Sequence, residues 1–133
     1  MSMSETMSDR LEMMQERMLG KGFGAVLGPK LEQLEEGFCR MSLAWREDLS
    51  RGDARIHGGV IAALIDKAGT TAAWAYTDIP EGTRGATIAM NVSFLEAAVT
   101  SMVAQGRPVG SQERPVRERV RHRWSPAHQQ NKL

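Results

Sequence analysis

The stretch from residue 55 to residue 66, RIHGGVIAALID, contains groups that could polarise a carbonyl and attack it. Gly58 and Gly59 directly precede an apolar helical pattern. The first N–H groups of a helix have no partner inside the helix, so they can bind an oxygen that carries negative charge. Asp66 lies within the apolar pattern, where a carboxylate is costly to bury unless it is paired or used. The stretch therefore predicts an oxyanion site together with a general base or nucleophile.

Helix geometry separates these two groups. Asp66 follows Gly58 by eight residues, which corresponds to roughly 12 Å along a helix axis. If both groups act on one carbonyl, a second copy of the helix must pass antiparallel and supply the missing half, as in a two-fold dimer. The alternative is structural: the helix packs tightly on a sheet, and Asp66 is bonded to a hydroxyl or an N–H group. Spacing alone leaves both interpretations open.

His57 could orient the loop before the helix through side-chain hydrogen bonds, or it could act as a general base. We favour the first role, because a neutral imidazole beside an oxyanion site is better suited to shaping the loop. The other histidines, His122 and His128, lie far along the chain, and no set of residues has the spacing of a metal site. The sequence also contains neither a nucleophile elbow nor a phosphate-binding loop.

The elements that must position these residues follow from hydrophobic periodicity. An amphipathic helix is expected over residues 5–19, with a stripe of methionine and leucine that we assign to packing. A hairpin follows, with strands over 27–34 and 38–45 and a turn at Glu35-Glu36-Gly37. The other expected elements are a loop over 49–56, a helix over 58–76, a strand over 84–95 and a short strand over 99–105. Cys39 lies on the apolar face of the second strand, so we interpret it as a packing residue rather than a nucleophile.

The chain after Gly106 differs from the rest. Residues 1–105 carry 10 basic and 14 acidic side chains, whereas residues 106–133 carry 7 basic and 2 acidic ones among several prolines. This composition predicts a loosely held tail, and its arginines make nucleic-acid binding only a weak alternative because no spaced motif accompanies them. The abrupt loss of alternation also suggests that the tail is out of register with an ancestral reading frame. Reading the gene in its other two frames tests that hypothesis.

Length and composition limit the number of domains, the disulfides and the membrane association that the chain can have. A chain of 133 residues is long enough for one domain with a real core. The single cysteine, Cys39, excludes an intramolecular disulfide and favours a reducing compartment. No apolar run approaches the roughly 20 residues that span a bilayer. We therefore expect a soluble, cytoplasmic protein with no membrane association.

Two segments resemble the hotdog-fold acyl-CoA thioesterases of the phenylacetate-degradation (PaaI) type. These are HGGVIAALID at 57–66 and ATIAMNVSFLEAA at 86–98, and LGPKLEQLEEGFCRMSLAWRED is similar to the family's first hairpin. The resemblance implies an α+β hotdog fold, in which an antiparallel sheet wraps a long central helix. It divides the chain into an N-terminal helix (1–20), a hotdog domain (21–106) and an atypical tail (107–133). The family's last two strands are rich in Val and Phe, so the corresponding strands here are expected to be atypical or missing.

The resemblance also implies a reaction, the hydrolysis of coenzyme A thioesters, with coenzyme A as part of the substrate and no bound cofactor. Asp66 is then the base or nucleophile, Gly58 and Gly59 bind the thioester oxygen from the other subunit, and Thr87 positions water. The substrate-contacting residues expected beside them are His57, Arg51 and Asn91. Arg51 stands where many relatives have Asn or a similar polar residue. The family forms homodimers and often tetramers, and the competing interpretation is a non-catalytic hotdog module that binds thioesters or only dimerises.

Overall fold

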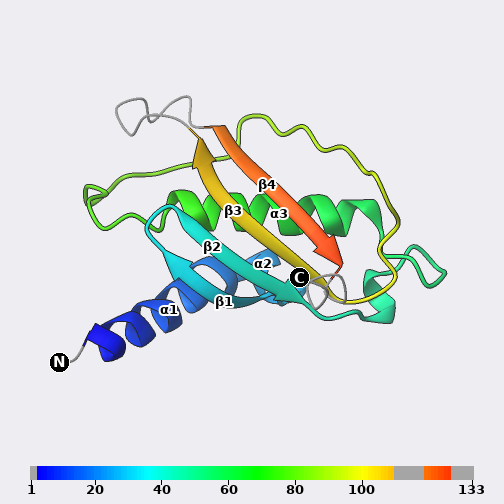
Figure 1. Cartoon of the computed structure of the whole chain (residues 1–133), viewed down its shortest axis with the longest axis horizontal. Helices are drawn as coiled ribbons and strands as arrows, with labels where there is room; N and C mark the ends of the chain where they lie inside the picture. Colours follow the sequence, from blue (N-terminus) through cyan, green and yellow to red (C-terminus); the bar gives the residue numbers. More distant parts are fainter. Residues whose placement is uncertain (1–2, 110–118, 127–133) are drawn as a thin grey trace.

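The computed structural model describes residues 3–109 and 119–126 as four helices and four strands (Figure 1). In chain order the elements are α1 (Met3–Leu19), α2 (Gly22–Leu27), β1 (Lys30–Glu35), β2 (Phe38–Leu43), the 3₁₀ helix η1 (Glu47–Leu49), α3 (Gly58–Ala73), β3 (Met102–Val109) and β4 (Arg119–Pro126). The strands form one antiparallel sheet in the order β1-β2-β3-β4. The long helix α3 lies across one face of this sheet, and α1 and α2 lie near its β1 edge (Figure 1).

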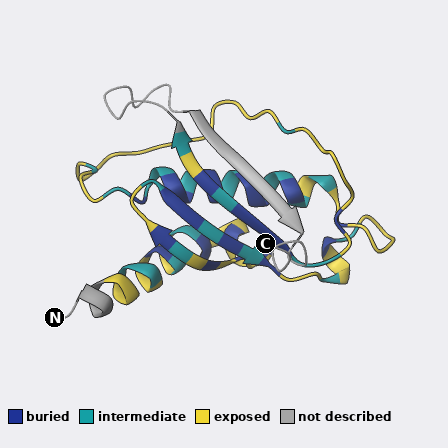
Figure 2. Cartoon of the chain, viewed as in Figure 1, coloured by how far each residue is buried: buried dark blue, intermediate teal, exposed yellow. Residues whose placement is uncertain are grey.

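The core lies between α3 and the two central strands (Figure 2). The alternation predicted for the second strand is confirmed, because Cys39, Met41 and Leu43 are all buried. Each of the three pairs with a residue of β3, and these partners are buried as well: Gly106, Ala104 and Met102 respectively. Leu64, Ala68 and Ala72 of α3 complete the contact from the other side. Small residues at this contact let the helix lie close to the strands.

Gly106 sets how closely β3 approaches α3. A Cβ atom at this position would lie 2.3 Å from the backbone oxygen of Ala68 and 2.7 Å from its carbonyl carbon. Because these are backbone atoms in the middle of a helix, they cannot move aside as a flexible side chain does. We expect Gly106→Ala to lower the free energy of unfolding by about 3 kcal/mol, at the upper end of overpacking effects.

Urea unfolding followed by circular dichroism measures this effect. The control is Gly58→Ala, because a Cβ there meets only the ring of Phe94, at an ordinary 3.5 Å. Equal midpoints for Gly106→Ala and the unsubstituted protein would show that β3 does not pack on α3 in this way.

The N-terminal predictions are confirmed with small changes of boundary. The first helix begins at Met3 rather than residue 5, and its methionine stripe contributes Met14 to the core. The hairpin forms with its turn at Glu35-Glu36-Gly37, where Gly37 has φ 69°. The short helix α2 was not predicted, and it takes up Leu27, which was expected to open the first strand.

The strand predicted over residues 84–95 is wrong for the single chain. These residues form a segment without a paired strand among the described residues, and all of them except Val92 are exposed (Figure 2). Ile88 is 84% exposed and Leu95 is 90% exposed. A strand requires a neighbour that accepts and donates backbone hydrogen bonds. The described part of this chain provides no such neighbour beside the segment.

Two strands include residues of the predicted tail. Instead of a short strand over 99–105, β3 runs from Met102 through Val109, and the backbone of Arg119–Pro126 pairs with it along its whole length as β4. The backbone can pair without aliphatic side chains, which explains why composition misled the prediction here. Residues 110–118 and 127–133, including His128, lie outside the described residues.

Candidate functional site

The loop before α3 is held at both ends by backbone hydrogen bonds. The N–H of Ile56 donates to the carbonyl of Ala98 (2.7 Å), and the N–H of His57 donates to the carbonyl of Leu49 (2.9 Å). Ser50 and Ile56 also form an isolated antiparallel bridge that closes the loop. The first residue of α3 therefore starts from a fixed position.

His57 caps α3, as the preferred interpretation of the sequence requires. It is the N-cap residue, and its Nδ1 accepts the N–H of Gly59 at 2.9 Å. Its backbone carbonyl accepts the N–H of Val60 at 2.9 Å, which begins the helical hydrogen bonds. An acceptor at Nδ1 must be unprotonated, so the ring in this arrangement is not a proton donor toward the helix. His57 thus shapes the helix start.

The same hydrogen bond separates the two glycines that were predicted to act together. The N–H of Gly59 is already taken by His57, whereas the N–H of Gly58 has no acceptor among the described residues. A free N–H at the first position of a 16-residue helix favours a negatively charged oxygen. Of the two glycines predicted to bind the oxyanion, Gly58 is therefore the one whose N–H group is available for it.

Asp66 and Thr87 lie together. The Thr87 hydroxyl donates to Oδ1 of Asp66 at 2.6 Å, although the two residues are 21 positions apart. Asp66 is half-buried on α3, while Thr87 belongs to the exposed segment after the helix. A carboxylate that accepts one hydroxyl hydrogen bond still has lone pairs for a water molecule or for attack on a carbonyl carbon.

Small side chains surround Asp66 on the helix surface. Ala62, Ala63 and Thr70 are neighbours at three or four residues' distance and are half-buried. The Thr70 hydroxyl donates to the backbone carbonyl of Asp66 at 2.9 Å, so it does not compete for the carboxylate. Because its neighbours on the helix are small, the carboxylate can be approached by a substrate or by another polypeptide.

The segment over residues 85–94 runs beside α3 in the opposite direction. Thr87 lies at Asp66, and the ring of Phe94 lies beside Gly58, where an added Cβ atom would meet it at 3.5 Å. Sequence reasoning missed the contact between Phe94 and Gly58, because the alternating pattern indicated only which residues share a face. The segment links the two halves of the candidate site, yet Gly58 and Asp66 remain about 12 Å apart along one helix.

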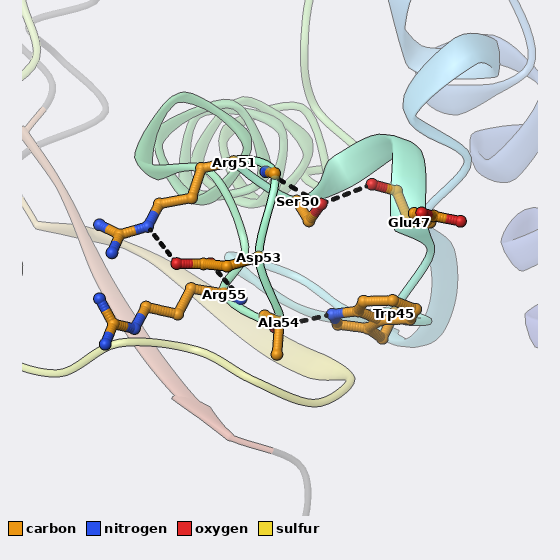
Figure 3. Close-up of polar contacts among 8 residues, drawn as sticks. Trp45, Glu47, Ser50, Arg51, Asp53, Ala54 and Arg55 are labelled. Carbon is orange, nitrogen blue, oxygen red and sulfur yellow. Dashed lines mark hydrogen bonds and ion pairs between the residues drawn. The ribbon is translucent and has the colours of Figure 1, made fainter.

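Arg51 lies in the exposed loop before α3, where its Nε is 3.2 Å from Oδ2 of Asp53 (Figure 3). Asp53 also accepts the backbone N–H of Arg55 at 2.8 Å, and this bond is the main reason that the pKa of Asp53 is lowered, with a smaller contribution from Arg51. Trp45 holds the loop from the other side by donating its indole N–H to the carbonyl of Ala54 (3.1 Å). Arg51 is thus occupied within its own loop.

Asn91 is exposed and has no hydrogen-bond partner among the described residues. The roles of Arg51 and Asn91 in substrate binding stay predictions. Within the described residues, no three His, Cys, Asp or Glu side chains are grouped to hold a metal ion. None of the described helices is long and apolar enough to cross a membrane.

Cys39 packs in the core, as predicted. It is fully buried, and its Sγ donates to the backbone carbonyl of Ala68 at 3.0 Å. Burial raises the pKa of the thiol to about 12. At neutral pH the residue is therefore a thiol rather than the reactive thiolate.

We expect Cys39 to resist a thiol reagent such as DTNB in the folded protein and to react fully in denaturant. As the chain has one cysteine, the colour reports this residue alone. Complete reaction within seconds in the native protein would contradict the buried position.

The family model described as Thioesterase superfamily matches residues 54–109, which include the loop, α3, the segment after it and β3. Among curated proteins, a candidate esterase from Halobacterium salinarum is 33% identical over 91 residues, covering 66% of this chain and 60% of that protein. A candidate esterase from Sulfurisphaera tokodaii is 35% identical over 74 residues, covering 56% and 53%. The chain thus spans between about half and three-fifths of the length of these relatives.

Solved structures share the architecture over most of the chain. A protein of the thioesterase superfamily has a TM-score of 0.72 at 26% identity, with 89% of this chain and 87% of that one covered. A candidate thioesterase from Ralstonia eutropha, described as related to phenylacetic acid degradation, has a TM-score of 0.67 at 18% identity, with 86% and 89% covered. The sequence match and the shared architecture together show that this chain carries a thioesterase-superfamily domain with the hotdog fold.

Proposed function

We propose that this protein hydrolyses acyl-CoA thioesters to a free acid and coenzyme A, at sites that two copies of the chain build together. The family and the candidate esterases support thioester hydrolysis in general. The observation that carries the proposal is the pairing of Asp66 with Thr87 on a helix whose first N–H, at Gly58, has no acceptor among the described residues. These are a base or nucleophile, a hydroxyl beside it and an oxyanion donor.

The proposed reaction begins when the thioester oxygen accepts the Gly58 N–H of one copy. Asp66 of the other copy then takes a proton from water, and the resulting hydroxide attacks the thioester carbon. Thr87 donates to the carboxylate, and its oxygen can accept a hydrogen bond from the water and so orient it. The C–S bond breaks, and the departing sulfur leaves as coenzyme A thiol when Asp66 returns to it the proton taken from water.

A second route uses the same groups. Asp66 attacks the thioester carbon directly, the C–S bond breaks and coenzyme A leaves as a thiolate that takes a proton from water, and water then hydrolyses the acyl anhydride that remains on Asp66. In both routes negative charge develops on the thioester oxygen, so both need the N–H of Gly58. The two routes differ only in whether an oxygen of Asp66 is transiently bonded to the acyl carbon.

Sharing between two copies follows from the separation within one chain. Gly58 and Asp66 lie about 12 Å apart along α3, too far to act on one carbonyl. The exposed apolar segment over residues 88–95 supports a partner in this region, because an unpaired extended edge with large apolar side chains invites pairing with another chain. We propose that the chain forms a two-fold homodimer and that dimers can associate into tetramers. We also propose a cytoplasmic location for the protein.

Thiol release from a panel of acyl-CoAs tests the proposed function, and we expect turnover with small or aromatic acyl groups. The buried Cys39 adds no fast signal of its own to the colour assay. Turnover above the uncatalysed rate supports a hydrolase. Binding of acyl-CoA without turnover would instead identify a non-catalytic thioester-binding module.

A further inference from the structure

A hollow lies away from Asp66, at the C-terminal end of α3. It has a volume of about 400 Å³, within the range of small-molecule sites. Its walls come from α1, from the chain that leaves α3 at Trp74, and from the turn over residues 79–83. Trp74 is eight residues beyond Asp66, which places the hollow roughly 12 Å further along the helix axis. It is therefore distinct from the candidate active site.

Two arginines of α1 line this hollow. Arg10 and Arg17 are seven residues apart and so lie on the same face of the helix. The guanidinium of Arg17 lies 5.4 Å from the centre of the Trp74 ring, and no acceptor for its N–H groups lies among the described residues. Arg10 donates one N–H to the backbone carbonyl of Ala75, which ties α1 to the end of α3. Among the described residues of the lining, Glu81 is the one acidic side chain, so the two arginines leave one net positive charge.

Two hydroxyl groups of the lining already have acceptors. The Thr77 hydroxyl donates to Glu36 at 2.6 Å, and the Thr83 hydroxyl donates to the carbonyl of Pro80 at 2.6 Å. Hydrogen bonds from Thr77 also lower the pKa of Glu36, which stays ionised just outside the hollow. Arg17 carries a positive charge, and its N–H groups have no acceptor among the described residues, so it can bind an anionic ligand that enters.

The remaining walls are apolar. The hollow is bordered by Trp74, Met13 and Ile79. The side chain of Met13 is exposed to solvent although it is almost entirely apolar. Methionine adapts its shape to differing apolar partners. A ligand that satisfies this lining has an apolar body of moderate size and one anionic end.

We propose that this hollow binds an organic carboxylate, with its carboxylate on Arg17 and its apolar body against Trp74, Met13 and Ile79. Arginine is suited to this task because its planar fork donates two parallel hydrogen bonds to a carboxylate. The proposal does not depend on the proposed thioesterase activity, since none of its residues belongs to that site. It assigns the protein a second, separate binding site for an acid.

Calorimetry with 4-phenylbutanoate and octanoate tests the proposal, with the neutral amide of each acid as the matched ligand control. We expect an acid to bind and its amide to bind about ten-fold more weakly or not at all, as loss of a charge-assisted hydrogen bond implies. Arg17→Gln should weaken acid binding by about the same factor. Lys21→Gln removes an equal charge from an exposed position outside the hollow and should leave binding unchanged.

NMR locates the ligand. The indole N–H signal of Trp74, assigned with Trp74→Phe, should shift on addition of the acid in the unsubstituted protein and not in Arg17→Gln. Circular dichroism verifies that the variants are folded. The proposal is overturned if neither acid binds the folded protein, if amide and acid bind equally, or if Arg17→Gln binds the acid as well as Lys21→Gln does. Tighter Arg17-dependent binding of adenosine 3′,5′-bisphosphate than of either acid would also overturn it, in favour of a phosphate site.

Discussion

Asp66→Asn is expected to lower kcat/KM for acyl-CoA hydrolysis by about 10² to 10⁴-fold, the range for loss of a general base. The amide has the shape of the carboxylate, and its oxygen can still accept the hydroxyl of Thr87, so the contact that places Thr87 remains. What is lost is the ability to take a proton from water or to attack carbon. Thiol release measured at several substrate concentrations separates kcat from KM.

The matched control is Asp48→Asn, which makes the same change at an exposed residue of η1 outside the candidate site. Asp48→Asn should hydrolyse thioesters as the unsubstituted protein does. Equal rates for Asp66→Asn and Asp48→Asn, with both proteins folded, would remove Asp66 from the reaction.

Gly58→Pro is expected to lower kcat by about 10² to 10³-fold, the effect of deleting one oxyanion donor. Proline lacks an N–H, and the first position of a helix tolerates it because the N–H there is not used by the helix. The residue before proline must be extended, and His57 already has φ −61° and ψ 134°. The substitution therefore removes the proposed donor while the helix start can keep its shape.

Gly58→Ala is the control for the added carbon atoms, because it keeps the N–H. The difference in kcat between Gly58→Ala and Gly58→Pro isolates the hydrogen bond to the thioester oxygen. If the two variants have the same kcat, the N–H of Gly58 does not stabilise the transition state.

Local patterns in the sequence predicted much of what positions the site. The paired glycines after His57 marked the start of α3, and alternation from Cys39 to Leu43 marked a strand with one buried face. Both signals depend on neighbours in sequence, such as a helix cap or a two-residue period. For the same reason the separation between Gly58 and Asp66 could be calculated from helix rise alone.

Other features depend on partners that a pattern does not contain. The alternation over residues 84–95 is typical of a strand, but whether a strand forms depends on a neighbouring edge, which the described part of the single chain lacks. The pairing of β4 with β3 uses backbone groups, so the arginine-rich composition concealed it. His57 accepts a hydrogen bond from the N–H of Gly59 because of how its imidazole ring is oriented. The spacing of residues in the sequence does not determine that orientation.

We propose that each active site combines Asp66 of one copy with Gly58 of the other. Co-expression of Asp66→Asn and Gly58→Pro chains with different tags allows the mixed dimer to be purified. In that dimer one site carries both substitutions and the other carries neither. We expect the mixed dimer to regain about half of the unsubstituted turnover per dimer, although each homodimer is nearly inactive. A mixed dimer as inactive as the two homodimers, or an active monomer of the unsubstituted chain, would contradict the shared site.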